Sequence, residues 1–130
     1  MRRRNNTQAR PRPKLPRVPE EMRQWSDLLL QEVLGWPQVN SRPMFGMAGL
    51  YRAGRIFAVL PRTRAMETRY SVSFKIPRRS GSLEKSLKAD PHILPPPGNA
   101  KWVSFELQSG DDLPQAIGWL SRAYELAAGR

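Results

Sequence analysis

Apolar side chains recur at spacings of three and four in two segments, one toward each end of the chain. The first begins after Pro19 and stops before Gly35 and Pro37, and the second follows Asp111-Asp112 and contains Pro114 in its first turn. Such spacing is typical of an amphipathic helix, and proline, glycine and acidic residues mark helix ends. The pattern predicts two terminal helices, with apolar faces of Met22, Trp25, Leu28, Leu29, Val33 and Trp36 in the first and Leu113, Ala116, Ile117, Leu120, Tyr124 and Ala127 in the second.

Between these segments the apolar residues alternate, as they do in strands. Residues 49–52 and 55–60 flank Ala53-Gly54 and predict a hairpin, and Met44-Phe45 are expected to begin a strand before it. Residues 101–107 alternate as well, with Trp102 pointing away from the inward side.

Residues 70–76 have the most regular alternation in the chain. We expect one buried and one solvated face, since strict alternation indicates a strand covered on one side only. The buried face is predicted to hold Tyr70, Val72, Phe74 and Ile76, and the solvated face Ser71, Ser73 and Lys75.

A short helix over residues 82–89, capped by Ser80 or Ser82, and a proline-rich connection over 91–98 complete the pattern. The predicted fold is therefore α+β. It has a curved antiparallel sheet of about five strands packed on the N- and C-terminal helices, in the order α-β-β-β-β-(α)-β-α.

The first 18 residues differ from the rest in composition. Residues 1–17 hold seven basic residues and no acidic one, and prolines interrupt them. Proline removes amide donors, so we predict a disordered basic tail over 1–18 and a single domain over 19–130. The tail is either a solubilising segment or an arm that contacts polyanions.

Charge and composition narrow the functional classes. The chain has 22 Lys and Arg against 11 Asp and Glu, a net charge of +11, and residues 42–101 hold 12 basic and three acidic residues. Such a field attracts nucleic acid. The absence of cysteine excludes disulfides and thiolate chemistry. With no secretory signal and no apolar run of about 20 residues, a cytoplasmic location without membrane contact is expected.

Several short motifs resemble a known family. Met44-Phe45-Gly46, Gly49-Leu50-Tyr51, the run 54–60 and Phe74-Lys75 are similar to the N-terminal domain of the competence regulator TfoX. The run 102–105 with 121–125 is similar to YjbR-type proteins and to the uncharacterised "luciferase domain" family. The link 61–69 is longer than is usual for TfoX-like proteins. The resemblance implies a compact α+β fold and a regulatory role, and it brings no catalytic residues.

Catalysis has little support in the sequence. His92 is the only histidine, and a nucleophile relay would need it to meet a hydroxyl and a carboxylate such as Asp90. No Gly-x-Ser-x-Gly elbow and no phosphate loop occur. We therefore expect no catalytic residues, no metal and no cofactor, and a small enzyme using His92 is the less favoured alternative.

Binding is better supported, in three forms. Nucleic acid is one partner, through the tail and a basic patch formed by Arg52, Arg55, Arg62, Arg64, Arg69, Lys75, Arg78 and Arg79. A protein partner or a second copy is another, anchored on Trp102 and Trp36. A small-molecule pocket lined by Met44, Met47, Trp119 and Tyr124 is the third. We favour a non-enzymatic regulatory module that acts through protein or polyanion contacts.

Overall fold

The computed structural model describes residues 15–94 and 100–128. The predicted tail residues 1–14 and residues 95–98 of the proline-rich connection lie outside this part. The helices are Glu20–Leu34 (α1), Gly81–Ala89 (α2), the 3₁₀ turn Gly110–Asp112 (η1) and Leu113–Leu126 (α3), and the strands are Val39–Met44 (β2), Met47–Arg52 (β3), Arg55–Pro61 (β4), Ser71–Lys75 (β5) and Trp102–Glu106 (β6).

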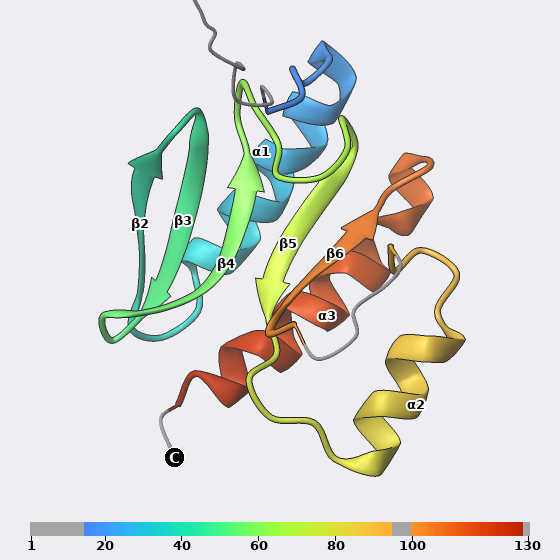
Figure 1. Ribbon diagram of the computed structural model, residues 1–130. Coiled ribbons are helices and arrows are strands. Elements are labelled where there is room, and N and C mark those ends of the chain that lie inside the picture. Colours follow the sequence, from blue (N-terminus) through green and yellow to red (C-terminus); the bar gives the residue numbers. More distant parts are fainter. Residues whose placement is uncertain (1–14, 95–99, 129–130) are drawn as a thin grey trace, which may run out of the picture.

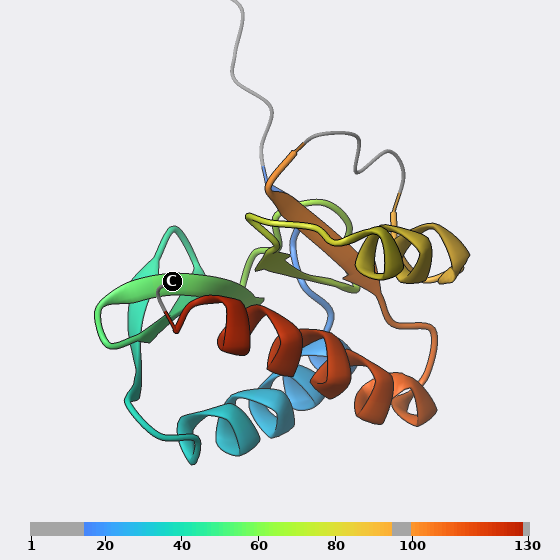
Figure 2. The same cartoon turned by 90° about the horizontal axis from the view of Figure 1, so that it is seen from below.

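The strands form one antiparallel sheet in the order β2-β3-β4-β5-β6, so each strand lies beside its neighbour in sequence. Helices α1 and α3 cover one face of this open sheet, and α2 lies beside its β6 end (Figure 1 and Figure 2). The predicted α+β fold and its element order are confirmed. We call the side opposite α1 and α3 the helix-free face.

The core lies between the sheet and the two long helices. Phe57, Phe74, Phe105 and Leu120 are each fully buried there, and Trp119 of α3 stacks on Phe74 with ring centroids 5.8 Å apart. Leu28, which the helical period places on the apolar face of α1, is instead 54% exposed because it lies at the border of that face. The structure contains no helix in its described residues that has the length and apolar character to cross a membrane.

Two tight turns connect the first three strands. Phe45-Gly46 joins β2 to β3 with φ of 52° and 82°, and Ala53-Gly54 joins β3 to β4 with φ of 49° and 84°. Positive φ at both central residues is the mark of a type I′ hairpin. The turn at Ala53-Gly54 was predicted. The strand start at Met44-Phe45 was wrong, because β2 ends at Met44 and Phe45 belongs to the turn.

The alternation in β5 predicted one face correctly and the other incorrectly. Val72, Phe74 and Ile76 are buried toward the helices as expected. The opposite side is not solvated, since Ser71 and Ser73 are each only 1% exposed. Strand β5 is interior to the sheet, and the Ser73 hydroxyl is hydrogen-bonded to that of Ser104 on β6 at 2.8 Å.

Residues 15–18, assigned to the tail by composition, belong to the fold. The Val18 amide donates to the Thr63 carbonyl and the Ala65 amide to the Pro16 carbonyl, each at 3.0 Å. Val18 also packs against the core. The loop after β4 thus supplies backbone hydrogen-bond partners to residues 16–18. The proline content of the tail does not predict these hydrogen bonds.

The acidic Asp112 is the N-cap residue of α3 as expected, but its side chain makes no cap hydrogen bond to that helix. Ser109 caps the preceding turn η1, and its hydroxyl accepts the Asp111 amide at 3.2 Å. The Asp112 carboxylate reaches back to the Gln108 and Ser109 amides at 2.8 and 3.2 Å, which completes a capping box.

Candidate anion-binding pocket

A β-bulge in β4 opens the sheet at one end. Leu50 pairs with Ala58 but Tyr51 pairs with Ile56, which leaves Phe57 as an extra residue on β4. Phe57 and Ala58 can therefore both face the helices, and Phe57 meets the ring of Tyr124 on α3 at 5.7 Å. Bulges bend the strand that carries them and interrupt its ladder.

The ladder between β4 and β5 is correspondingly short. It comprises only the pairs Ala58–Phe74 and Val59–Ser73. Before Ala58 and after Phe74 the two strands are no longer paired, and the last turn of α3 lies at the gap. We call this opening the wedge.

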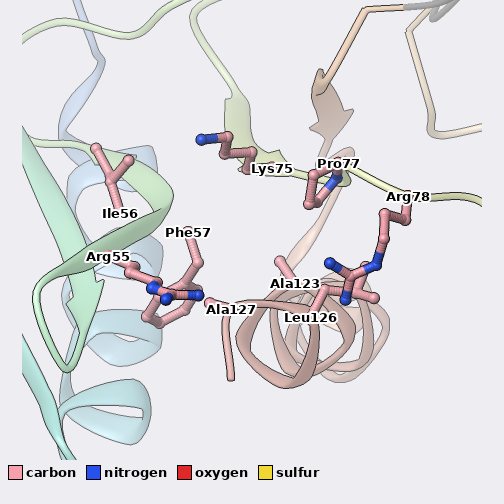
Figure 3. Close-up of a pocket in the computed structure, with 9 residues that line it drawn as sticks. All are labelled: Arg55, Ile56, Phe57, Lys75, Pro77, Arg78, Ala123, Leu126 and Ala127. Carbon is pink, nitrogen blue, oxygen red and sulfur yellow. The ribbon is translucent and has the colours of Figure 1, made fainter. Parts of the chain in front are cut away.

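The wedge contains a pocket of about 280 Å³ (Figure 3). The residues that line it come from the start of β4, from the end of β5 with the following loop, and from the end of α3. They are Arg55, Ile56, Phe57, Lys75, Pro77, Arg78, Ala123, Leu126 and Ala127. Three are cationic, the others are apolar, and none is acidic.

The three cations surround the apolar floor from different elements. Arg55 and Arg78 reach over the last turn of α3 from β4 and from the loop after β5, whereas Lys75 extends away from that helix (Figure 3). Arg55 and Arg78 are exposed and Lys75 is half-buried. Among the described residues none of the three has an ion-pair or hydrogen-bond partner.

Arg52, which lies beside the wedge, already has partners. Its guanidinium donates to the Tyr124 carbonyl at 3.0 Å and lies over the Tyr124 ring at 4.0 Å. The C-terminal end of a helix carries partial negative charge, and α3 has no basic residue in its own last turn. Arg52 therefore supplies the cation at this helix end, and Arg55, Lys75 and Arg78 have no ion-pair partner within residues 15–94 and 100–128.

The other predicted basic residues lie elsewhere. Arg62, Arg64 and Arg69 belong to the loop that joins the opposite ends of β4 and β5. The Arg62 guanidinium pairs with Asp27 at 2.6 Å, the Arg64 guanidinium donates to the Leu15 carbonyl at 3.0 Å, and Arg69 is exposed. Arg79 follows Arg78 but hydrogen-bonds to the Ala100 carbonyl. The eight residues thus form no single patch.

The two tryptophans predicted as partner anchors have different surroundings. Trp36 packs on Tyr124 with ring centroids 5.1 Å apart and contacts the core. Trp102 is half-buried on β6, and it is not among the residues that pack on the core. The predicted small-molecule pocket does not form, because Trp119 and Tyr124 belong to the helix-side core and Met44 and Met47 do not.

His92 is held by structural contacts. Its Nδ1 donates to the Glu106 carbonyl at 2.9 Å, its ring stacks on Phe105 at 5.0 Å, and Nε2 lies 3.6 Å from the Asp112 carboxylate. Asp90 accepts from the His92 amide and from the Trp119 indole at 2.8 and 2.7 Å. The hydrogen bonds of the imidazole go to no hydroxyl, so the described contacts attach the segment at 90–93 to β6 and α3.

A metal site is not present in the described ranges, where no three His, Asp or Glu side chains gather closely enough to hold an ion. Comparison with protein-family models, curated proteins and solved structures finds no match for this chain. The resemblance to TfoX-like and YjbR-like proteins stays a prediction.

Proposed function

We propose that this protein is a non-enzymatic binding module that takes polyanions, above all nucleic acid, at the wedge. The observation that carries the proposal is the set of three cations, Arg55, Lys75 and Arg78, which share one pocket and have no acidic partner in the part of the chain that the structure describes. The pI of about 11.2 provides a long-range field of the same sign.

Like charges held close together repel, and a bound phosphate relieves that repulsion. The apolar floor strengthens the effect, because Ile56, Phe57 and Leu126 exclude part of the water that would screen a phosphate from the guanidinium groups. Arginine also matches phosphate with two parallel hydrogen bonds. The wedge thus combines charge, geometry and partial dehydration at one place.

The test is the salt dependence of binding to a labelled single-stranded DNA 20-mer, measured by fluorescence anisotropy. The variant Arg55→Gln/Lys75→Gln/Arg78→Gln is compared with Arg23→Gln/Lys85→Gln/Lys88→Gln, which removes the same charge from the exposed surfaces of α1 and α2. Three lost phosphate contacts reduce the slope of log affinity against log salt by about 2, at roughly 0.7 per phosphate of a single strand. Equal losses in both variants would contradict a role for the wedge.

A second candidate function, docking of a protein partner or a second copy, is favoured by Phe45. This side chain is 80% exposed at the tip of the β2–β3 hairpin and has a φ of 52°, which is costly for a bulky residue. The Gly46 carbonyl beside it accepts the Arg62, Thr63 and Arg64 amides at 3.1, 2.9 and 3.1 Å, which fixes the tip. Sedimentation of wild-type protein and Phe45→Ser tests it, with any self-association expected to disappear in the variant.

A further inference from the structure

Trp102 differs from the other three tryptophans of the chain. Trp25 packs on Tyr70 at 5.8 Å, Trp36 packs on Tyr124 at 5.1 Å, and Trp119 stacks on Phe74 at 5.8 Å and donates its indole proton to Asp90. Trp102 has neither a ring partner nor a hydrogen bond for its indole nitrogen among the described residues. Trp102 is half-buried, so part of its side chain is exposed in the described structure.

The strand geometry places Trp102 on the helix-free face. Its neighbour Val103 is buried in the helix-side core, and successive side chains of a strand point to opposite faces. Tyr51 lies on the same face by the same reasoning, since its neighbour Leu50 is in the core. Tyr51 carries the guanidinium of Arg42 above its ring, at 5.0 Å from the centroid.

Trp102 and Tyr51 lie on the two sides of the wedge. Trp102 pairs with Lys75 of β5, and Tyr51 pairs with Ile56 of β4. Lys75 and Ile56 both line the wedge pocket. Three strand spacings separate the two aromatic residues. At about 4.8 Å for each paired spacing they would lie roughly 15 Å apart, and the opening between β4 and β5 makes the separation larger. A strand of several nucleotides is therefore needed to reach both rings.

The row between the two rings is formed by Ile56 and Lys75, which are both half-buried at the wedge. Ser73 and Ser104, the next residues along β5 and β6 on this side, are buried and hydrogen-bonded to each other, so the ligand would contact the row at the wedge and not the serines. The acidic residue on this face of β6 is Glu106, at the opposite end of the strand, where its carboxylate accepts the Thr68 hydroxyl at 2.7 Å. Lys75, which pairs with Trp102, places a cation beside this ring, and Arg55 and Arg78 lie at the wedge on the side of α3 (Figure 3).

We propose that the helix-free face selects single-stranded nucleic acid, with one unpaired base stacked on Trp102, a second on the Arg42–Tyr51 pair, and the intervening phosphates at the wedge. This inference rests on the proposed polyanion-binding function and names its ligand more narrowly. Unpaired bases stack on aromatic rings and on guanidinium planes whatever their sequence. In a duplex the base faces are already stacked on one another, so no base face is free to stack on Trp102 or Tyr51.

The experiment compares three labelled probes on the full chain: oligo-dT of 12 nucleotides, an abasic 12-mer with the same phosphates, and a 12-base-pair duplex. Wild-type protein is expected to bind oligo-dT about 100-fold more tightly than the abasic strand, at about tenfold for each of the two stacked bases. Trp102→Leu is expected to reduce that ratio about tenfold and to leave abasic affinity unchanged. Trp102→Phe retains a ring and is expected to retain most of the ratio.

Phe45→Leu is the matched control, because it removes an exposed aromatic ring outside this row and is expected to keep the wild-type ratio. Equal affinity of wild-type protein for oligo-dT and the abasic strand would overturn the stacking inference and leave phosphate binding intact. Tighter binding of the duplex would overturn it as well. Failure to bind any of the probes would overturn the proposed function too. If Trp102→Leu unfolds in circular dichroism, Tyr51→Leu is expected to lower the ratio in its place.

Discussion

The two ends of the sheet are both rich in arginine, and they use it differently. At the end where β4 joins β5, Arg62 and Arg64 bond to Asp27 and to the Leu15 carbonyl. At the wedge end, Arg55, Lys75 and Arg78 have no such partner in the described part of the chain. Arginines of the first kind hold segments of this fold together, whereas those of the second kind are available to a ligand.

The comparison shows that a count of cations is a poor guide to a binding surface. What distinguishes the two ends is whether protein oxygens already satisfy the guanidinium groups. Substitution of the paired Arg52, Arg62 or Arg64 should therefore change stability. Substitution of Arg55, Lys75 and Arg78 should instead change binding.

The largest contrast is expected between the two type I′ turns. A Cβ on Gly46 would lie 2.7 Å from the Thr63 hydroxyl and 2.8 Å from the Arg64 Cγ, whereas a Cβ on Gly54 would meet nothing within 4 Å. Gly46→Ala is expected to lower the free energy of unfolding by about 3 kcal/mol, and Gly54→Ala, which has only the backbone cost, by about 1 kcal/mol. Urea denaturation measures both free energies of unfolding. Equal losses would show that Thr63 and Arg64 move away from the added Cβ at no cost, and would contradict the prediction.

Next in size is the contrast between Arg52 and Arg55, which lie on paired positions of one hairpin. Arg52→Ala loses the hydrogen bond to the Tyr124 carbonyl and the contact with its ring, and is expected to cost about 2 kcal/mol. Arg55→Ala is expected to stay within about 0.5 kcal/mol of wild type. Thermal unfolding compares them, and a similar drop for Arg55→Ala would mean that Arg55 has a structural role.

A smaller effect is expected at Arg64. Arg64→Ala loses the bond to the Leu15 carbonyl and is expected to cost about 1 kcal/mol. Faster hydrogen exchange of the Val18 and Ala65 amides should accompany it, because these amides hold residues 16–18 in place. Arg69→Ala, an exposed residue of the same loop, serves as the control and should leave both amides unchanged.

The smallest effect on stability is expected for the wedge itself. Removal of the three charges in Arg55→Gln/Lys75→Gln/Arg78→Gln breaks no described bond and relieves repulsion, so the midpoint of thermal unfolding should stay the same or rise slightly. A fall of several degrees would contradict the view that these cations are free for a ligand.

Much of the fold follows from the sequence because its signals are local. Proline and glycine mark the ends of α1, and Ala53-Gly54 between two apolar runs specifies a hairpin. The buried faces of β5 and β6 follow from strict alternation. The burial of Ser71 and Ser73 does not, because it depends on β4 and β6 flanking β5 on both sides.

The site was harder to predict, for two physical reasons. The bulge at Phe57 sets the wedge, and it has no sequence signal, because residues 56–60 are all apolar and show no alternation that a bulge could interrupt. The grouping of Arg55 with Lys75 rather than with Arg62 follows from antiparallel order, in which the start of β4 and the end of β5 share one end of the sheet. Phe45-Gly46 forms a turn, but the apolar Met44 and Phe45 favoured the prediction of a strand at this place.

Nuclear magnetic resonance offers the most direct measurement of the central claim that the wedge, and not the loop after β4, receives phosphates. ¹⁵N-labelled protein is titrated with the abasic 12-mer, and backbone amide shifts are followed. We predict that the largest shifts within the described residues fall on 55–57, 75–78 and 123–127, with 62–69 nearly unchanged. Shifts concentrated in 62–69, with the wedge residues unmoved, would contradict the claim.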